Sequence, residues 1–256
     1  MKKILLALAL ATSCHFSYAE TANPFAQVES MIQAKNLTGA YQELEKLAKT
    51  GNAEALYHQA YMHQIGEGTK QDNKKAQQLF EQASKKGFGR ASYLLAQHYL
   101  SGTLGLKADI AKGKSYLETA EKQGHSIASI DLAMLLLSEG NANSEKAGLA
   151  KLDTLIKADN PHAQYAQAVY FISSGVKAKN EKTVQQGLDS MEKLASKGFI
   201  PALMSVAAMF TQGNLVDQNL PEAKKILTEL SKAKVPQAQS ALDSVNKMLE
   251  QKNKKS

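Results

Sequence analysis

The chain has 256 residues, of which 43% are hydrophobic and 21% charged, so it can bury one large core or two ordinary ones and is not a disordered chain. Its formal net charge is +7, but of the 31 basic residues only Arg90 is an arginine. Because recognition of phosphates and bases favours the forked guanidinium group, this composition argues against a nucleic-acid-binding surface.

The first residues have the pattern of a secretory signal. Lys2 and Lys3 precede an apolar run over residues 4–11, and Ser17 and Ala19 place small residues at the two positions that a signal peptidase reads. Eight apolar residues are too few to cross a bilayer in a helix, which takes about 20. We therefore expect residues 1–19 to be a signal peptide and the protein to be periplasmic, with secretion from the cell as the alternative.

The single cysteine, Cys14, leaves a further alternative open. It follows a short sequence that loosely resembles a bacterial lipoprotein processing box, which would make the protein an outer-membrane lipoprotein. Cleavage after Ala19 instead removes Cys14 and leaves neither a disulfide framework nor a thiolate metal site.

Small residues recur along the chain at intervals of 35 to 39 residues. The positions that would close a helix are Gly51, Gly87, Gly124, Asp159, Gly198 and Lys234. Four residues after them come Ala55, Ala91, Ala128, Ala163, Ala202 and Ala238, and eleven residues before them come Ala40, Ala76, Gly113, Gly148, Gly187 and Ala223. Small residues at fixed places on helical faces let neighbouring helices approach closely, so each unit predicts a helix A, a loop, a helix B and a turn.

Prolines and acidic residues fit this division. Pro24, Pro161, Pro201 and Pro236 are predicted to open A helices, and Pro221 to open a B helix. Asp72 and Asp109 stand where N-caps or first-turn acids of B helices belong. No alternating β-branched run bounded by turn signals predicts a strand.

One unit carries a distinctive set of residues: Ala55, Ala60, Gly66, Gly68, Asp72, Ala76, Ala83 and Gly87. This unit, and nearly as well residues 91–124, resembles the Sel-one-like repeat (SLR) family, which is related to the tetratricopeptide repeat. The resemblance implies an all-α, right-handed α/α solenoid with no β-sheet, with A helices on a concave face and B helices on a convex face. The periodicity implies a stack of helix pairs independently, because one amphipathic pair cannot bury its apolar face alone.

We divide the chain accordingly. The expected solenoid spans residues 20–251 between the signal peptide and a basic tail at residues 252–256. Its parts are an N-terminal cap pair at 24–51, repeats at about 53–87, 89–124, 126–159, 161–198 and 200–234, and a C-terminal capping helix at 236–250.

A second stripe on each A helix is expected to face the concavity. It mixes aromatic, amide and aliphatic side chains with one arginine, which suits recognition of an extended peptide. The candidate partner-binding residues are Tyr57, Tyr61, Gln64, Arg90, Tyr93, Gln97 and Tyr165. The alternative is that Tyr57, Tyr93 and Tyr165 pack against the next repeat.

No pattern predicts catalysis, a metal site or a cofactor. The histidines lack the spacing that holds a metal on one helix. Ser-x-x-Lys occurs at Ser190, Ser231 and Ser244, a number near chance for this composition, and Lys49-Thr50-Gly51 precedes all three, which does not fit the penicillin-recognising fold.

The favoured hypothesis is a non-enzymatic periplasmic or secreted scaffold that binds a protein or peptide segment in its concave groove. The resemblance implies a role in assembly or regulation of bacterial cell-envelope machinery, such as a secretion or motility system. The alternative is an envelope hydrolase or a glycan- or β-lactam-binding protein, and the Lys-rich tail could add weak contact with anionic envelope polymers.

Overall fold

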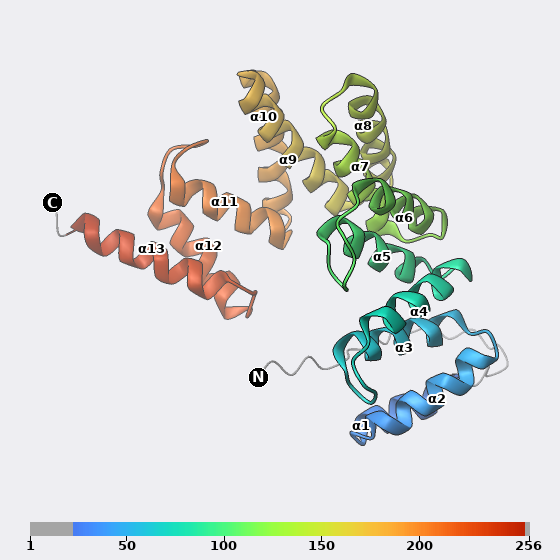
Figure 1. Cartoon of the computed structure of the whole chain (residues 1–256). Coiled ribbons are helices and arrows are strands. Elements are labelled where there is room, and N and C mark those ends of the chain that lie inside the picture. The colour runs from blue at the N-terminus through green and yellow to red at the C-terminus, as the bar shows by residue number, and fades with distance from the viewer. Residues whose placement is uncertain (1–22, 254–256) are drawn as a thin grey trace, which may run out of the picture. The chain divides into compact units, whose positions relative to one another are not determined.

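The computed structural model describes residues 23–253, and within them the chain forms thirteen helices and no strand (Figure 1). The predicted all-α class is confirmed. The predicted signal peptide, with Cys14, and residues 254–256 of the predicted basic tail lie outside the described residues. The helices are α1 Ala26–Gln33, α2 Leu37–Lys49, α3 Ala53–Ile65, α4 Asn73–Lys85, α5 Gly89–Ser101, α6 Ile110–Lys122, α7 Ser126–Ser138, α8 Ala142–Lys157, α9 Pro161–Ala178, α10 Glu181–Ser196, α11 Ile200–Gln212, α12 Leu220–Lys232 and α13 Ala238–Asn253.

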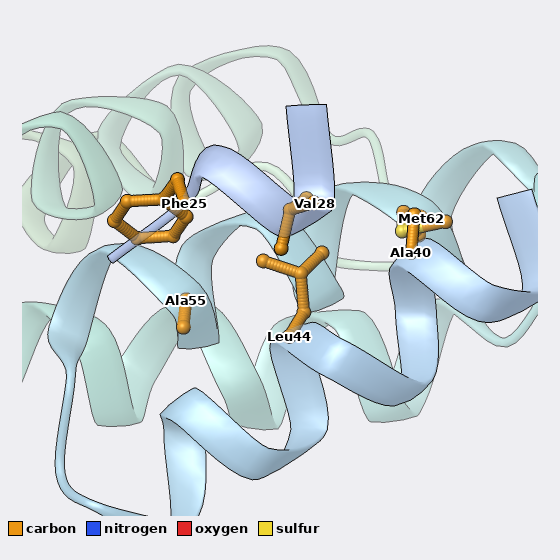
Figure 2. Packing of buried hydrophobic residues seen from close by; sticks show 6 residues of the cluster. All are labelled: Phe25, Val28, Ala40, Leu44, Ala55 and Met62. Atoms are coloured by element: carbon orange, nitrogen blue, oxygen red, sulfur yellow. The ribbon is translucent and has the colours of Figure 1, made fainter. Parts of the chain in front are cut away.

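The described helices form two compact units, whose boundary in the sequence lies between Gln82 and Ala83, inside α4. In the first unit, Asn36 and Asn52 start α2 and α3, because each side-chain oxygen accepts a hydrogen bond from an N–H group in the first turn. Figure 2 shows the apolar core of this unit, where Val28 and Leu44 point toward one another. Its buried members are Phe25, Val28, Ala40, Leu44, Ala55 and Met62.

The second unit repeats one helix pair. The A helices are α5, α7, α9 and α11, the B helices are α6, α8, α10 and α12, and α13 follows the last pair. Each of these helices packs against the next one along the chain, and α7 also contacts α9. This order buries a continuous series of small apolar clusters instead of one central core.

Glycines bring A and B helices close together in this unit. A Cβ atom on Gly148 of α8 would lie 2.8 Å from the carbonyl oxygen of Ala133 in α7, and one on Gly187 of α10 would lie 2.8 Å from that of Ala168 in α9. Real Cβ atoms do not approach backbone so closely, so the recurring small residues set the spacing between paired helices.

A residue in left-handed backbone conformation closes each turn from a B helix to the next A helix. Gly198 has a φ angle of 79°, and the two non-glycine residues at this position, Asp159 and Lys234, have φ angles of 55° and 56°. A side chain makes this conformation unfavourable, by roughly 1–2 kcal/mol. The repeat geometry therefore overrides local preference in two turns.

The predicted N-caps are confirmed, since Asp72 and Asp109 each accept a hydrogen bond of 2.9 Å from the N–H group three residues on. Pro161, Pro201 and Pro221 lie at the first or second position of their helices, as expected. The prediction for the other two prolines was wrong.

Pro24 and Pro236 each precede their helix by two residues. Gln237 has a φ angle of 69°, so a turn separates Pro236 from the start of α13.

Candidate partner-binding face

Tyr93 and Gln97 of α5 form a polar link to the next A helix. The Tyr93 hydroxyl and the Gln97 side-chain amide both donate to Oδ2 of Asp131 in α7, each over 2.9 Å. The Tyr93 ring also stacks on His125, with ring centroids 4.4 Å apart and planes at 17°. Burial, together with the hydrogen bond to Asp131 and its charge, raises the pKa of Tyr93 to about 12, so this hydroxyl stays protonated and keeps donating.

Tyr165 of α9 makes the corresponding link one pair of helices further on. Its hydroxyl lies 2.9 Å from the Ser205 hydroxyl of α11, and its ring packs at 5.9 Å from that of Phe199. Asp131 follows Tyr93 by 38 residues and Ser205 follows Tyr165 by 40, so each tyrosine reaches the same register of the next A helix. Packing against the next repeat, the alternative raised for these tyrosines, thus describes Tyr93 and Tyr165 in the second unit.

The helix between these two links uses apolar contact instead. Ile130 occupies the tyrosine position of α7 and packs with Met134 against a buried cluster that includes Ala163 and Ala166 of α9. Polar and apolar connections therefore alternate along the A helices of the second unit.

The candidate residues of the first unit are placed differently from those of the second unit. Tyr57 is buried, with 9% of its surface exposed, and its ring lies 5.7 Å from that of Phe80. Tyr61 and Gln64 are half-buried. The structure thus brings Tyr93 and Gln97 together on one acceptor, while Tyr57, Tyr61 and Gln64 belong to the first unit.

Arg90 is the exposed member of the predicted set, near the start of α5. Burial, and then the positive charge of Arg90, lowers the pKa of His125, which holds this histidine neutral at physiological pH. Ile127 and Ile200, near the starts of α7 and α11, are 52% and 46% exposed.

Sequence reasoning missed Asp131, His125 and Ser205. Asp131 is the single charged residue in α7, whose other residues are apolar apart from three serines. That isolation is a usable signal, because a lone carboxylate in a largely apolar helix needs a partner. His125 and Ser205 gave no comparable signal, since polar residues at turns and small residues on helices are ordinary.

Charge is distributed unevenly between the two kinds of helix in the second unit. Each of α6, α8, α10 and α12 carries five charged residues. In contrast, α5, α7 and α9 carry one each, and α11 carries none. We call the half-exposed and exposed stripe of the A helices the A-helix face, and its members are Tyr93, Gln97, Ile127, Ile130, Met134, Tyr165, Val169, Met204 and Ala208.

Across residues 23–253, no three His, Cys, Asp or Glu side chains are placed to hold a metal ion. In the same range, no helix is long and apolar enough to cross a membrane.

Comparison with known proteins agrees with this architecture. The model of the Sel1 repeat matches residues 53–88 and 89–125. Residues 53–125 therefore hold two Sel1 repeats. Sel1 repeats generally mediate protein–protein interaction, and proteins built from them are typically non-catalytic scaffolds. No curated protein matches the chain in sequence.

Solved structures extend the Sel1-like fold beyond the two matched repeats. A Sel1 repeat protein from Oxalobacter formigenes is 18% identical, with a TM-score of 0.65 over 88% of this chain and 88% of that chain. The protective antigen c5321, present in uropathogenic Escherichia coli strains and displaying an SLR fold, is 21% identical, with a TM-score of 0.57 over 86% of this chain and 49% of that chain. These likenesses show an α-helical repeat solenoid along most of the chain.

Proposed function

We propose that this Sel1-like repeat protein is a non-enzymatic scaffold that binds a protein partner on its A-helix face, in the periplasm, and serves the assembly or regulation of envelope machinery. One observation carries the proposal. The A helices of the second unit present aromatic, amide and aliphatic groups with almost no charge, whereas the B helices beside them are highly charged. A helix face without charges costs little to desolvate, which favours burial against a partner.

The hydrogen bonds between A helices support the same use. Because Tyr93 and Tyr165 are fixed by Asp131 and Ser205, their rings lose little further freedom when a partner covers them. A surface that is ordered in advance binds with a smaller entropic cost. The links between repeats thus prepare the A-helix face for binding.

The test replaces Ala208, which is exposed in the middle of α11, with glutamate. Ala208→Glu removes no packing but introduces a charge on the face, in the last of its A helices. The matched control is Ala147→Glu, the same change at an exposed site on the B helix α8. Wild type and both variants are used to capture proteins from an envelope extract, with bound proteins quantified by mass spectrometry.

We expect one partner to be retained by wild type and by Ala147→Glu and to fall about tenfold with Ala208→Glu, since burying an uncompensated charge costs more than 1 kcal/mol. Circular dichroism should give the same helicity for all three. Equal capture by the two variants would remove the A-helix face from the proposal.

The periplasmic address is supported by the signal pattern in the sequence. Osmotic-shock fractionation followed by N-terminal sequencing should find the protein in the periplasmic fraction, beginning at Glu20. A chain that retains Met1, or one that carries lipid on Cys14, would contradict this part of the proposal.

The hydrolase alternative gains no support from the serines of the three Ser-x-x-Lys pairs. Ser190 and Ser244 donate to backbone carbonyls one turn earlier in their own helices, and Ser231 donates to the side chain of Gln239. Since a nucleophilic serine must donate to a base, these hydroxyls are not arranged for attack.

A further inference from the structure

The turns that lead from B helices into A helices form a strongly basic edge in the second unit. Its lysines are all exposed, and none forms an ion pair with a residue in the range 23–253. They are Lys85, Lys86, Lys122, Lys157, Lys197 and Lys234, and we call them the basic edge. Asp159 is the one acidic residue within these turns, and its carboxylate accepts a hydrogen bond from Gln164.

Helix dipoles alone do not account for the excess of positive charge at this edge. Lysines near the ends of B helices are favoured by the helix dipole, but the same edge also holds the starts of A helices, where acidic residues are favoured. The B helices α8, α10 and α12 carry Glu145, Glu181 and Glu222 in their first turns, whereas none of α5, α7, α9 and α11 has an acidic residue there. The positive charge of the edge is thus left without internal compensation.

A cavity of about 320 Å³ opens on this edge between the turn before α9 and the turn before α11. Pro161, Leu194 and Phe199 supply its apolar walls, and Lys197, Gln164 and Asp159 supply its polar rim. The volume is large enough for an aliphatic side chain. A lysine therefore stands directly beside an apolar hollow.

We infer that the basic edge binds an acidic protein segment whose aliphatic side chain enters this cavity while its neighbouring carboxylates pair with Lys157 and Lys197. Charge complementarity selects an acidic ligand, and the apolar walls select a protein segment over a phosphate or sugar polymer, which has no aliphatic side chain to bury. The inference rests on the proposed function, because it names the chemistry of the partner and a second surface that holds it.

Spacing fits a short extended segment. Packed helices lie about 8–10 Å apart, and α8 and α10 both pack against α9, so the turns that hold Lys157 and Lys197 lie within roughly 20 Å, the length of about six extended residues. One continuous segment can therefore contact both lysines and place a side chain in the cavity.

The probe is a fluorescein-labelled ten-residue peptide of Glu and Asp with two central leucines, titrated with the full chain and followed by fluorescence anisotropy. The test variant is Lys157→Glu with Lys197→Glu. The matched control is Lys146→Glu with Lys224→Glu, which makes the same change of net charge at two exposed, unpaired lysines on B helices. Circular dichroism checks that both double variants fold, and Lys157→Gln with Lys197→Gln gives a milder version of the test.

We expect the edge variant to weaken binding at least tenfold, the glutamine version to weaken it less, and the control to change it less than twofold. The peptide with central serines in place of leucines should bind about tenfold more weakly, because it leaves the cavity unfilled. Equal weakening by the two double variants, or equal binding of the serine peptide and equal competition by polyphosphate, would overturn the inference and indicate general attraction of anions.

Capture of the natural partner by the variants distinguishes a failure of this inference from a failure of the proposed function. A partner that is lost with Ala208→Glu but kept by the lysine variant would overturn the basic edge and leave the A-helix face standing. A partner lost with the lysine variant but kept by Ala208→Glu would do the reverse.

Discussion

In the second unit, the interactions that link one A helix to the next differ chemically from those that link one B helix to the next. On the A side, neutral donors meet partly buried acceptors, as when Tyr93 and Gln97 both bond to Asp131. On the B side, Lys151 of α8 forms an ion pair with Glu121 of α6 over 2.7 Å, with about 30% of each side chain exposed. The first kind of link suits the face that we propose binds a partner, and the second suits a face that remains in water.

The two kinds of helix meet at the glycines, so the largest effect should come from closing that gap. Gly148→Val places a branched side chain where a Cβ atom alone would lie 2.8 Å from the Ala133 carbonyl oxygen and 2.8 Å from Leu137. We expect a loss of about 3 kcal/mol in the free energy of unfolding, measured by urea titration. Ala147→Val, at the preceding exposed position of the same helix, is the control and should cost only about 0.5 kcal/mol.

The comparison between A-side and B-side links can be tested directly. Asp131→Ala should lower the free energy of unfolding by about 2 kcal/mol, because it leaves two partly buried donors without an acceptor. Glu121→Ala, which removes the ion pair with Lys151, should cost less than about 1 kcal/mol and should cost less still at high salt. Similar losses from both variants would mean that the two sides do not differ in the way proposed here.

Acid should lower the stability of the A side through two histidines, His98 and His125. Burial lowers the pKa of His98, and burial together with Arg90 lowers that of His125, so the unfolded chain binds more protons than the folded one just below pH 6.5. The free energy of unfolding should therefore fall as pH is lowered through the unfolded pKa toward the folded ones.

His125→Gln is the variant that tests this pH dependence. It should make the fall between pH 7.5 and 5.5 shallower, as measured by urea unfolding at several pH values. A slope identical to that of wild type would show that His125 does not contribute.

The fold could be predicted from the sequence because it depends on the repeat interval and on the small size of the residues that recur at it. The alanines and glycines that recur at intervals of 35 to 39 residues predict the helices and their contacts, since only small residues fit where paired helices touch. The roles of individual side chains were less accessible. The stripe that contains Tyr93 was visible, but its acceptor Asp131 lies 38 residues away, and nothing local fixes which side of a stripe bonds to the next repeat and which faces solvent.

The smallest expected effect concerns a turn that A and B helices share. Lys234 has a φ angle of 56° at the position where Gly198 has 79°, so its side chain opposes a conformation that glycine adopts freely. Lys234→Gly should raise the free energy of unfolding by about 0.5 kcal/mol, because relief of this strain exceeds the added flexibility of the unfolded chain. Lys234→Ala keeps the Cβ atom and removes the charge, so it should leave stability unchanged. If both variants raised stability equally, the gain would come from lower charge on the basic edge and not from the backbone.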